Sequence, residues 1–284
     1  MKKFDFRETA MHIVFALCAC VSIAVVILIC LFLFANGFSA ISEIGFKEFI
    51  FGMDWKPSEE LFGLFPMIIG SIYVTAGAII IGVPIGVLCA AFMAKFCPAG
   101  LYKILKPAIE LLAGIPSVVY GFFGLCVIVP LMQNLFGGSG KGVLTASVLL
   151  GIMILPTIIG VSEAALRAVP QSYYEGSLAL GATHERSVFL CMMPAAKSGI
   201  LAGVILGIGR AIGETMAVIM VAGNQKIIPD SIFSGVRTLT ANIVLEMGYA
   251  TDLHRGALIA TGVVLFVFIL LINLSFSAIN RNKR

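Results

Sequence analysis

Two charged residues, Arg210 and Glu214, interrupt an otherwise apolar run from Ser198 to Asn224. An ionised side chain in hydrocarbon costs from about 2.5 to more than 10 kcal/mol, so such residues face the protein interior or a water-filled path. On one helix, a separation of four residues lets the two side chains form a buried salt bridge that fixes the helix orientation. Alternatively, the guanidinium offers a fork of donors to a tetrahedral oxyanion, and Glu214 holds it when no anion is present. We favour the anion path, because intramembrane ionisable residues mark functional sites by default.

This run is expected to form one helix from Gly199 to Val221. Its glycines at GxxxG spacing then lie on the stripe that carries the two charges. Such small residues let helices approach closely in a bilayer. The stripe therefore predicts tight packing, with Arg210, Glu214 and the adjacent Thr215 beside the path.

A kink is expected in another apolar run, where Gly114 and Pro116 stand near its cytoplasmic end. Proline removes a backbone hydrogen bond, and irregular backbone at membrane depth is tolerated only inside protein or beside a cavity. Pro116 and Ser117 are therefore candidates for a wall of the path. A proline kink that serves packing alone is the alternative.

The composition is that of an integral membrane protein. Of the 284 residues, 60% are hydrophobic and 12% are charged, whereas a soluble domain has about 25% charged residues. Six apolar runs are each long enough for the roughly 20 residues that a spanning helix needs. They are 13–42, 61–94, 111–140, 142–162, 198–224 and 256–280. We predict an all-α membrane protein with six transmembrane helices.

Lysine and arginine favour the cytoplasmic ends of such helices. With the amino terminus inside, 12 of them fall on the cytoplasmic side and 6 on the external side. Both termini are thus predicted to be cytoplasmic, with residues 1–11 as the cytoplasmic N-terminus, 12–38 as the first span and 39–65 as an external loop. The first run is about twice as long as the roughly 7 to 15 residues of a secretory h-region, so we expect an uncleaved anchor. The net charge of +4 follows from this topology and requires no nucleic acid.

A polar stretch from Ser172 to Pro194 separates two of the apolar runs. Ser172 followed by Glu175 is a capping-box pattern, and Gly181 supplies a left-handed stop. The pattern predicts a helix over residues 173–180. Because a helix of about two turns is marginal in water, it must dock against a membrane surface or a partner.

The external segments carry two further expectations. The single tryptophan, Trp55, is interpreted as an aromatic anchor at the membrane interface. A short amphipathic helix is expected near residues 239–247, and Arg237 and Glu246 are candidates for contact with an external binding protein.

Several other patterns do not indicate sites. The glycine-rich stretch 137–142 lacks the first glycine and the hydroxyl residue of a Walker phosphate loop, and it is predicted to face outward. The seven cysteines include no C-x-x-C pair, so we expect neither a disulfide nor a metal site. The three histidines are scattered and suggest no proton relay.

Three motifs carry a resemblance that extends over nearly the whole chain. They are Gly213-Glu-Thr-Met-Ala217, Gly114-Ile-Pro-Ser-Val-Val-Tyr-Gly121 and Met153-Ile-Leu-Pro156. Together they resemble the PstC-type permeases of ATP-driven phosphate importers, in the family of binding-protein-dependent transport system inner-membrane components. The polar loop resembles the coupling loop of ABC-importer permeases, because Glu175, Gly181 and Pro194 fall on its most informative positions. Gly176 and Ser177 replace the two alanines of that pattern.

The resemblance implies a type I ABC-importer permease fold, with a permease core over 66–284 and a coupling loop over 170–195. It implies a non-enzymatic subunit without cofactor, in the plasma membrane of a prokaryote, that forms half of a pathway for inorganic phosphate. Its implied partners are a sister permease, two copies of a cytoplasmic ATPase, an external phosphate-binding protein and membrane lipid. The ATPase would contact the coupling residues Tyr174, Glu175, Gly176, Ser177, Leu178, Ala179, Gly181, Ala182 and Pro194.

Two alternatives remain open at this point. A permease for another oxyanion, such as sulfate or molybdate, would need the same arginine. An ATP-independent carrier or channel is the alternative from a different class. It would leave the polar cytoplasmic loop without a purpose, and the two halves of the chain show no clear duplication of interrupted helices.

Overall fold

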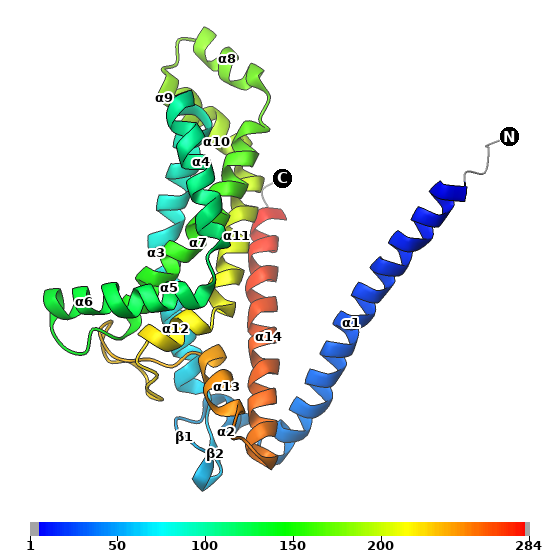
Figure 1. The fold of residues 1–284 in the computed structure, drawn as a ribbon, viewed down its shortest axis with the longest axis vertical. Coiled ribbons are helices and arrows are strands. Elements are labelled where there is room, and N and C mark those ends of the chain that lie inside the picture. The colour runs from blue at the N-terminus through cyan, green and yellow to red at the C-terminus, as the bar shows by residue number, and fades with distance from the viewer. Residues whose placement is uncertain (1–5, 282–284) are drawn as a thin grey trace.

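The computed structural model describes residues 6–281 of the chain. It is almost entirely helical, with most of its long helices arranged lengthwise in one bundle (Figure 1). The long helices are α1 (Phe6–Ile44), α3 (Phe65–Ala91), α4 (Ala99–Gly114), α7 (Val143–Arg167), α11 (Lys197–Gly213) and α14 (Asp252–Arg281).

Within the described residues, five helices are long and apolar enough to cross a membrane. A sixth candidate is the bent pair His184–Ala195 and Lys197–Gly213, whose two parts meet at 72°. The six predicted spans therefore match this count when the bent pair is taken as one span. The apolar character follows from the sequence runs, but the bend does not.

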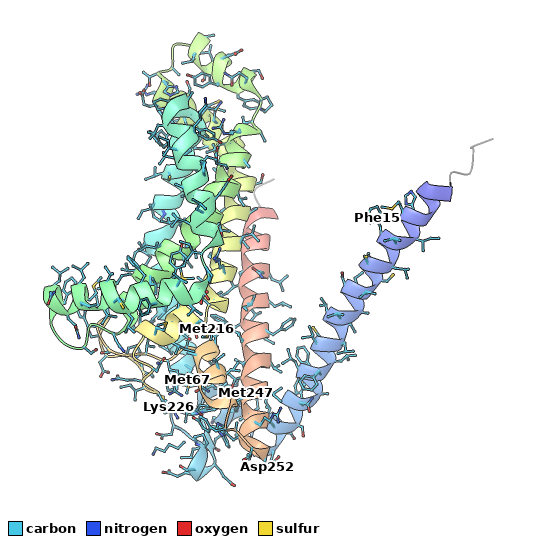
Figure 2. The ribbon with its side chains drawn as sticks, in the orientation of Figure 1. Phe15, Met67, Met216, Lys226, Met247 and Asp252 are labelled. Atoms are coloured by element: carbon cyan, nitrogen blue, oxygen red, sulfur yellow. The ribbon has the colours of Figure 1, made fainter. Side chains whose placement is uncertain are left out.

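Helix α1 leans away from the bundle (Figure 1). It contacts α14 near its own C-terminal end, where Gly37 lies against Val263 and Gly256 lies against Ala40. Farther along, residues such as Phe15 stand clear of the bundle, and Phe15 is 63% exposed (Figure 2). Small residues at the crossing permit the close approach of two helices.

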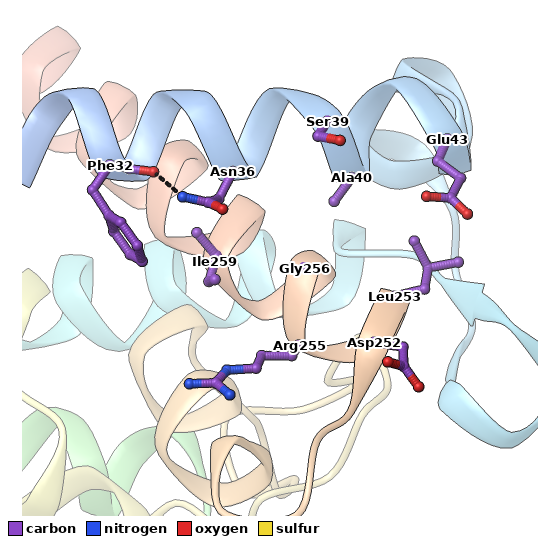
Figure 3. A pocket seen from close by; sticks show the side chains of 10 residues that line it. All are labelled: Phe32, Asn36, Ser39, Ala40, Glu43, Asp252, Leu253, Arg255, Gly256 and Ile259. Carbon is purple, nitrogen blue, oxygen red and sulfur yellow. Dashed lines mark hydrogen bonds between the residues drawn. The ribbon is translucent and has the colours of Figure 1, made fainter.

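A cleft of about 530 Å³ opens where α1 and α14 diverge (Figure 3). Its lining includes Asn36 and Glu43 from α1 and Asp252 and Arg255 from α14. None of the predicted pathway or coupling residues lines this cleft. It is a consequence of the splayed α1 and lies outside the candidate site.

The bundle core is built by α3, α7 and α11. Small residues bring these helices together: Gly77 of α3 lies against Ser147 of α7, and Gly207 of α11 lies against Ile158 of α7. Gly203 lies against Val161. The tight packing predicted for the glycine stripe of the fifth span is therefore confirmed.

The predicted kink near Pro116 is also confirmed. Helix α4 ends at Gly114, Pro116 is extended with ψ 142°, and α5 (Ser117–Phe123) begins directly after it. A π-helical turn, η3 (Gly124–Ile128), joins α5 to α6 (Val129–Phe136). Figure 1 shows α5 and α6 running across the long axis of the bundle.

One end of the bundle, which we call the hairpin end, carries the segment after α1. It consists of α2 (Phe46–Phe51), β1 (Trp55–Lys56), a short 3-10 turn η1 (Pro57–Glu59) and β2 (Leu61–Phe62). The strands pair antiparallel, with Trp55 opposite Phe62. Helix α13 (Leu239–Met247) lies at the same end, as predicted (Figure 1).

The opposite end, which we call the loop end, carries the polar stretch. It forms α8 (Gln171–Ala179), α9 (His184–Arg186), the π-helical η4 (Ser187–Met192) and α10 (Met193–Ala195). A second π-helical segment, η2 (Phe92–Phe96), ends the α3 span at this end. Figure 1 shows α8 projecting beyond the bundle.

Candidate functional site

The fifth span is broken between Arg210 and its predicted partner. Helix α11 ends at Gly213, Glu214 is extended with ψ 133°, and Thr215 has φ −124°. A separate short helix, α12 (Met216–Val221), follows. The prediction of one continuous helix from Gly199 to Val221 is therefore wrong.

The break also separates the predicted ion pair. Among the described residues, no salt bridge joins Arg210 to a carboxylate. A spacing of four residues aligns side chains only on an unbroken helix, and the extended backbone of Glu214 turns its side chain elsewhere. The buried salt bridge and the proposed holding of the guanidinium by Glu214 are both contradicted.

Arg210 instead lies half-buried on α11, next to α7. Its Nη1 donates a hydrogen bond of 3.4 Å to Thr157 Oγ1 of α7. Its charge also lies within Coulombic range of Tyr120 on α5. A guanidinium has five N–H donors, and this is the single side-chain hydrogen bond found for Arg210 among the described residues. Its other N–H donors have no hydrogen-bond partner among the described residues.

Glu214 and Thr215 satisfy the polar groups at the break itself. The Glu214 carboxylate accepts a hydrogen bond of 3.2 Å from the backbone N–H of Ala217, inside the first turn of α12. Its backbone carbonyl accepts a bond of 3.0 Å from Thr240 Oγ1 of α13. The Thr215 hydroxyl donates to Gly213 O at 3.2 Å. Orphan groups of a broken helix need such partners at membrane depth.

The two interrupted spans meet each other. Helix α5 packs on α12, and Gly121 of α5 lies against the backbone of Ala217 at the start of α12. Pro116 is exposed and Ser117 half-buried at the start of α5. No hydrogen bond among the described residues joins either of them to Arg210.

Helix α8 begins at Gln171, two residues earlier than its pattern suggested. Pro170 precedes it with extended backbone, and no side chain caps its N-terminus. The predicted capping box of Ser172 and Glu175 is therefore wrong, because Ser172 lies inside the first turn. The predicted stop at Gly181 is confirmed, since Gly181 has φ +87°.

The C-terminus of α8 forms a Schellman motif. The N–H of Gly181 donates to Leu178 O at 2.9 Å, and that of Ala182 donates to Ser177 O at 3.1 Å. These bonds satisfy the last carbonyls of the helix and redirect the chain. They leave Leu180 at the tip with 91% of its surface exposed.

The predicted coupling residues divide into exposed and docked sets. Glu175, Gly176, Leu178 and Ala179 are exposed on α8, and Pro194 is exposed on α10. Tyr174 faces the bundle instead, where its hydroxyl meets His184 Nδ1 at 2.7 Å. The side chain of His184 also packs on Phe96, with ring centroids 4.5 Å apart. Tyr174 thus anchors α8 and leaves its outer face free.

Sequence reasoning missed a buried carboxylate at the loop end. Glu163 of α7 is 2% exposed and accepts hydrogen bonds from Tyr102 Oη at 2.7 Å, Lys106 Nζ at 2.9 Å and Arg167 Nε at 2.8 Å. Arg167 also donates to Met93 O. The cluster ties α4, α7 and η2 together.

A second buried carboxylate, Glu246 of α13, was missed at the hairpin end. Its Oε2 accepts from Trp55 Nε1 at 2.7 Å and lies 3.0 Å from His254 Nε2. Its Oε1 lies 2.7 Å from Lys226 Nζ and 2.6 Å from Arg237 Nη1. Burial alone would raise the pKa of Glu246, but hydrogen bonds from Lys226, Trp55 and Arg237 outweigh it and lower the pKa to about 2.

This cluster corrects two predictions. Trp55 is 2% exposed and bonded to Glu246, so it is not an anchor at the membrane interface. Glu246 and Arg237 face each other, so they are not a free surface for a binding protein. His254, which sequence reasoning had assigned no role, is one of the partners of Glu246. The sequence did carry a signal for both clusters. Glu163 and Glu246 each stand near apolar stretches, and a carboxylate that is buried there requires hydrogen-bond or charged partners.

The fold and the site define a class of protein: a multi-pass helical membrane protein, with two interrupted spans that pack on each other and a helix projecting from one end. The comparisons agree with this class. Residues 82–284 match the family model described as binding-protein-dependent transport system inner membrane component. The chain belongs to this family.

Curated relatives cover most of the chain. It is 41% identical over 266 residues to the probable ABC transporter permease protein YqgH of Bacillus subtilis, covering 90% of this chain and 86% of that protein. It is 38% identical over 261 residues to the phosphate transport system permease protein PstC of Mesorhizobium japonicum, covering 84% and 80%. These relatives are permease subunits, which are membrane components rather than enzymes.

Solved structures agree on the fold. The chain resembles a chain of the inward-facing MetNI methionine ABC transporter with a TM-score of 0.62 and 19% identity, covering 81% of this chain and all of that one. A chain of an amino acid ABC transporter gives a TM-score of 0.54 at 19% identity, covering 76% and 92%. The predicted ABC-importer permease fold is therefore confirmed.

Proposed function

We propose that the chain is the permease subunit of an ATP-driven importer of inorganic phosphate and that it forms half of the translocation pathway. Relatives named as phosphate transport system permeases, at 38% and 35% identity over 84% and 82% of the chain, support the substrate. The family supports location in the plasma membrane of a prokaryote, as a multi-pass protein.

The observation that carries the proposal is the hydrogen bonding of the Arg210 guanidinium. A guanidinium between two interrupted spans, bonded to one neutral hydroxyl, keeps donors available for a tetrahedral oxyanion. Arginine retains its charge under all physiological conditions and binds phosphate oxygens with two parallel N–H donors. Thr157 steadies the guanidinium without neutralising it.

The partners follow from the same proposal. A sister permease completes the pathway, two copies of an ATPase bind at the loop end, and an external phosphate-binding protein delivers the anion. The exposed surface of α8 and the turn after it suit ATPase docking, because Tyr173, Leu178 and Leu180 expose apolar surface there. ATP binding would draw the coupling helices together and open the cavity outward, and hydrolysis would reset it.

The test is phosphate uptake by the complete complex in proteoliposomes with internal ATP. In Arg210→Gln, loss of a charged hydrogen-bond donor, worth about 1.5–3 kcal/mol, predicts uptake reduced by at least about tenfold. Arg255→Gln makes the same chemical change at an exposed position and serves as the matched control. Size-exclusion chromatography verifies that both complexes assemble.

Three results would contradict the proposal. Unchanged uptake in Arg210→Gln would remove the arginine from the path. Competition by sulfate or molybdate at concentrations near that of phosphate would replace the substrate with another oxyanion. Uptake by this chain alone, without ATP, would replace the importer with a carrier or channel.

A further inference from the structure

Helix α13 joins the outer hairpin to the centre of the bundle. At its C-terminal end, Glu246 binds Trp55 of the hairpin, Lys226 and Arg237 of the loop after α12, and His254 of α14. Both oxygens of the carboxylate are engaged. In Figure 2, Lys226 and Met247 lie at this end of the molecule. The hairpin, the loop after α12 and the start of α14 therefore meet on one side chain of α13.

The other end of α13 reaches the break in the fifth span. Thr240 Oγ1 donates to the carbonyl of Glu214 at 3.0 Å. The backbone N–H of Leu239 donates to Ser71 Oγ of α3 at 3.0 Å, and Thr238 caps the helix through the N–H of Ala241. A nine-residue helix spans about 13 Å as a stiff element. The helix is therefore bonded to Glu214 near one end and to the hairpin cluster near the other.

The position of the C-terminal end of α13 depends on the charge of one group, the Glu246 carboxylate. One carboxylate faces two permanent cations, Lys226 and Arg237, which are 33% and 11% exposed. If the carboxylate is neutralised, the two cations repel each other in a poorly solvated region, and the tryptophan and histidine lose their shared acceptor. The C-terminal end of α13 is then released from the hairpin.

We propose that Glu246 is a positioning residue for transport. It fixes α13 between the outer hairpin and the break, so that Thr240 holds the Glu214 carbonyl and with it the backbone that follows Arg210. A partner that moves the hairpin from outside would thus alter the break through α13. This inference rests on the proposed function only in placing the path at Arg210, because the mechanical link itself requires no substrate.

Hydrogen exchange of the assembled complex tests the link directly. Thr240→Val removes the hydrogen bond to Glu214, together with the 3.1 Å contact between the Thr240 and Thr238 hydroxyls, and preserves the side-chain shape. Thr261→Val is the matched control, since its buried hydroxyl bonds only to Ala257 O within α14. Loss of the net contribution of the bond to Glu214 predicts roughly fivefold faster exchange of the amides of residues 216–219 in Thr240→Val. Thr261→Val should leave them unchanged.

Glu246→Gln tests the other end of the link. Faster exchange is expected in α13 and again in residues 216–219, with the exchange of α8 unchanged. Trp55→Phe removes one donor while leaving the charges in place, so it should produce the same pattern with a smaller amplitude. It provides the test if Glu246→Gln fails to assemble. Faster exchange of α13 without any change in residues 216–219 would overturn the inference.

Transport kinetics separate positioning from mere stability. In Thr240→Val complexes that assemble fully, we expect a lower maximal rate of phosphate uptake with an unchanged half-saturating concentration of binding protein. A purely structural role would lower assembly and leave the rate per assembled complex intact. The exchange result is independent of the transported anion, so a wrong substrate and a wrong link give different outcomes.

Discussion

Neutralising Glu163 should destabilise the loop end of the bundle strongly. In Glu163→Gln, a carboxylate with 2% exposure loses its charge opposite Lys106 and Arg167 while Tyr102 retains a partial acceptor. Breaking a fully buried pair by removing one partner costs about 3–5 kcal/mol. Because Lys106 and Arg167 are 33% and 45% exposed and partly solvated, the lower part of that range, ~3 kcal/mol, is expected here.

The chain provides a matched control for this change. Glu110 meets the same lysine, Lys106, at 3.9 Å, but it is 66% exposed. Glu110→Gln removes an exposed pair on one helix, which is worth at most about 0.5 kcal/mol. The two variants therefore lose the same charge next to the same cation and differ in burial.

Thermal unfolding of the purified complex, followed by cysteine-reactive dye, measures the difference. With roughly 2–4 °C per kcal/mol for a chain of about this size, Glu163→Gln should melt on the order of 10 °C below the parent protein, and Glu110→Gln within about 2 °C of it. Melting temperatures of the two variants within about 2 °C of each other would refute the assignment of Glu163 as a buried electrostatic anchor.

Three further predictions follow from the packing and the electrostatics. The pKa of Glu246 is lowered from 4.5 to about 2 in the folded protein. The ionised carboxylate therefore contributes ~3 kcal/mol to the stability, which is complete above pH 4.5 and is lost as the pH falls toward 2. Acid unfolding of Glu246→Gln should lack this pH dependence. Gly77→Leu should reduce the yield of folded protein, because its added carbon would overlap Ser147, whereas Gly160→Leu, with open space around it, should not. Gly181→Ala should destabilise the end of α8 by about 1 kcal/mol, because Gly181 has a φ of +87°. Gly176→Ala, inside the helix, should instead slow the hydrogen exchange of α8. Equal effects of the two variants on the exchange of α8 would contradict this account of the loop.

The apolar runs determined the class of the protein without any tertiary information. A bilayer requires about 20 apolar residues in each spanning helix, so the length and composition of the runs suffice to predict a multi-pass helical protein. Local rules also predicted the break at Pro116, the left-handed Gly181 and the helix over residues 239–247. Each of these depends on the conformational preference of a few adjacent residues.

Only the tertiary structure decided where the charges go. The sequence pattern paired Arg210 with Glu214, but the break at Glu214 is stabilised by Thr240, which is 26 residues away in the chain. The partners of Glu246 come from segments up to 191 residues distant, including Trp55. The cost of burying a charge is met by whichever donors the fold brings near it. Spacing along one helix determines a contact only while that helix remains unbroken, and tertiary packing decides whether it does.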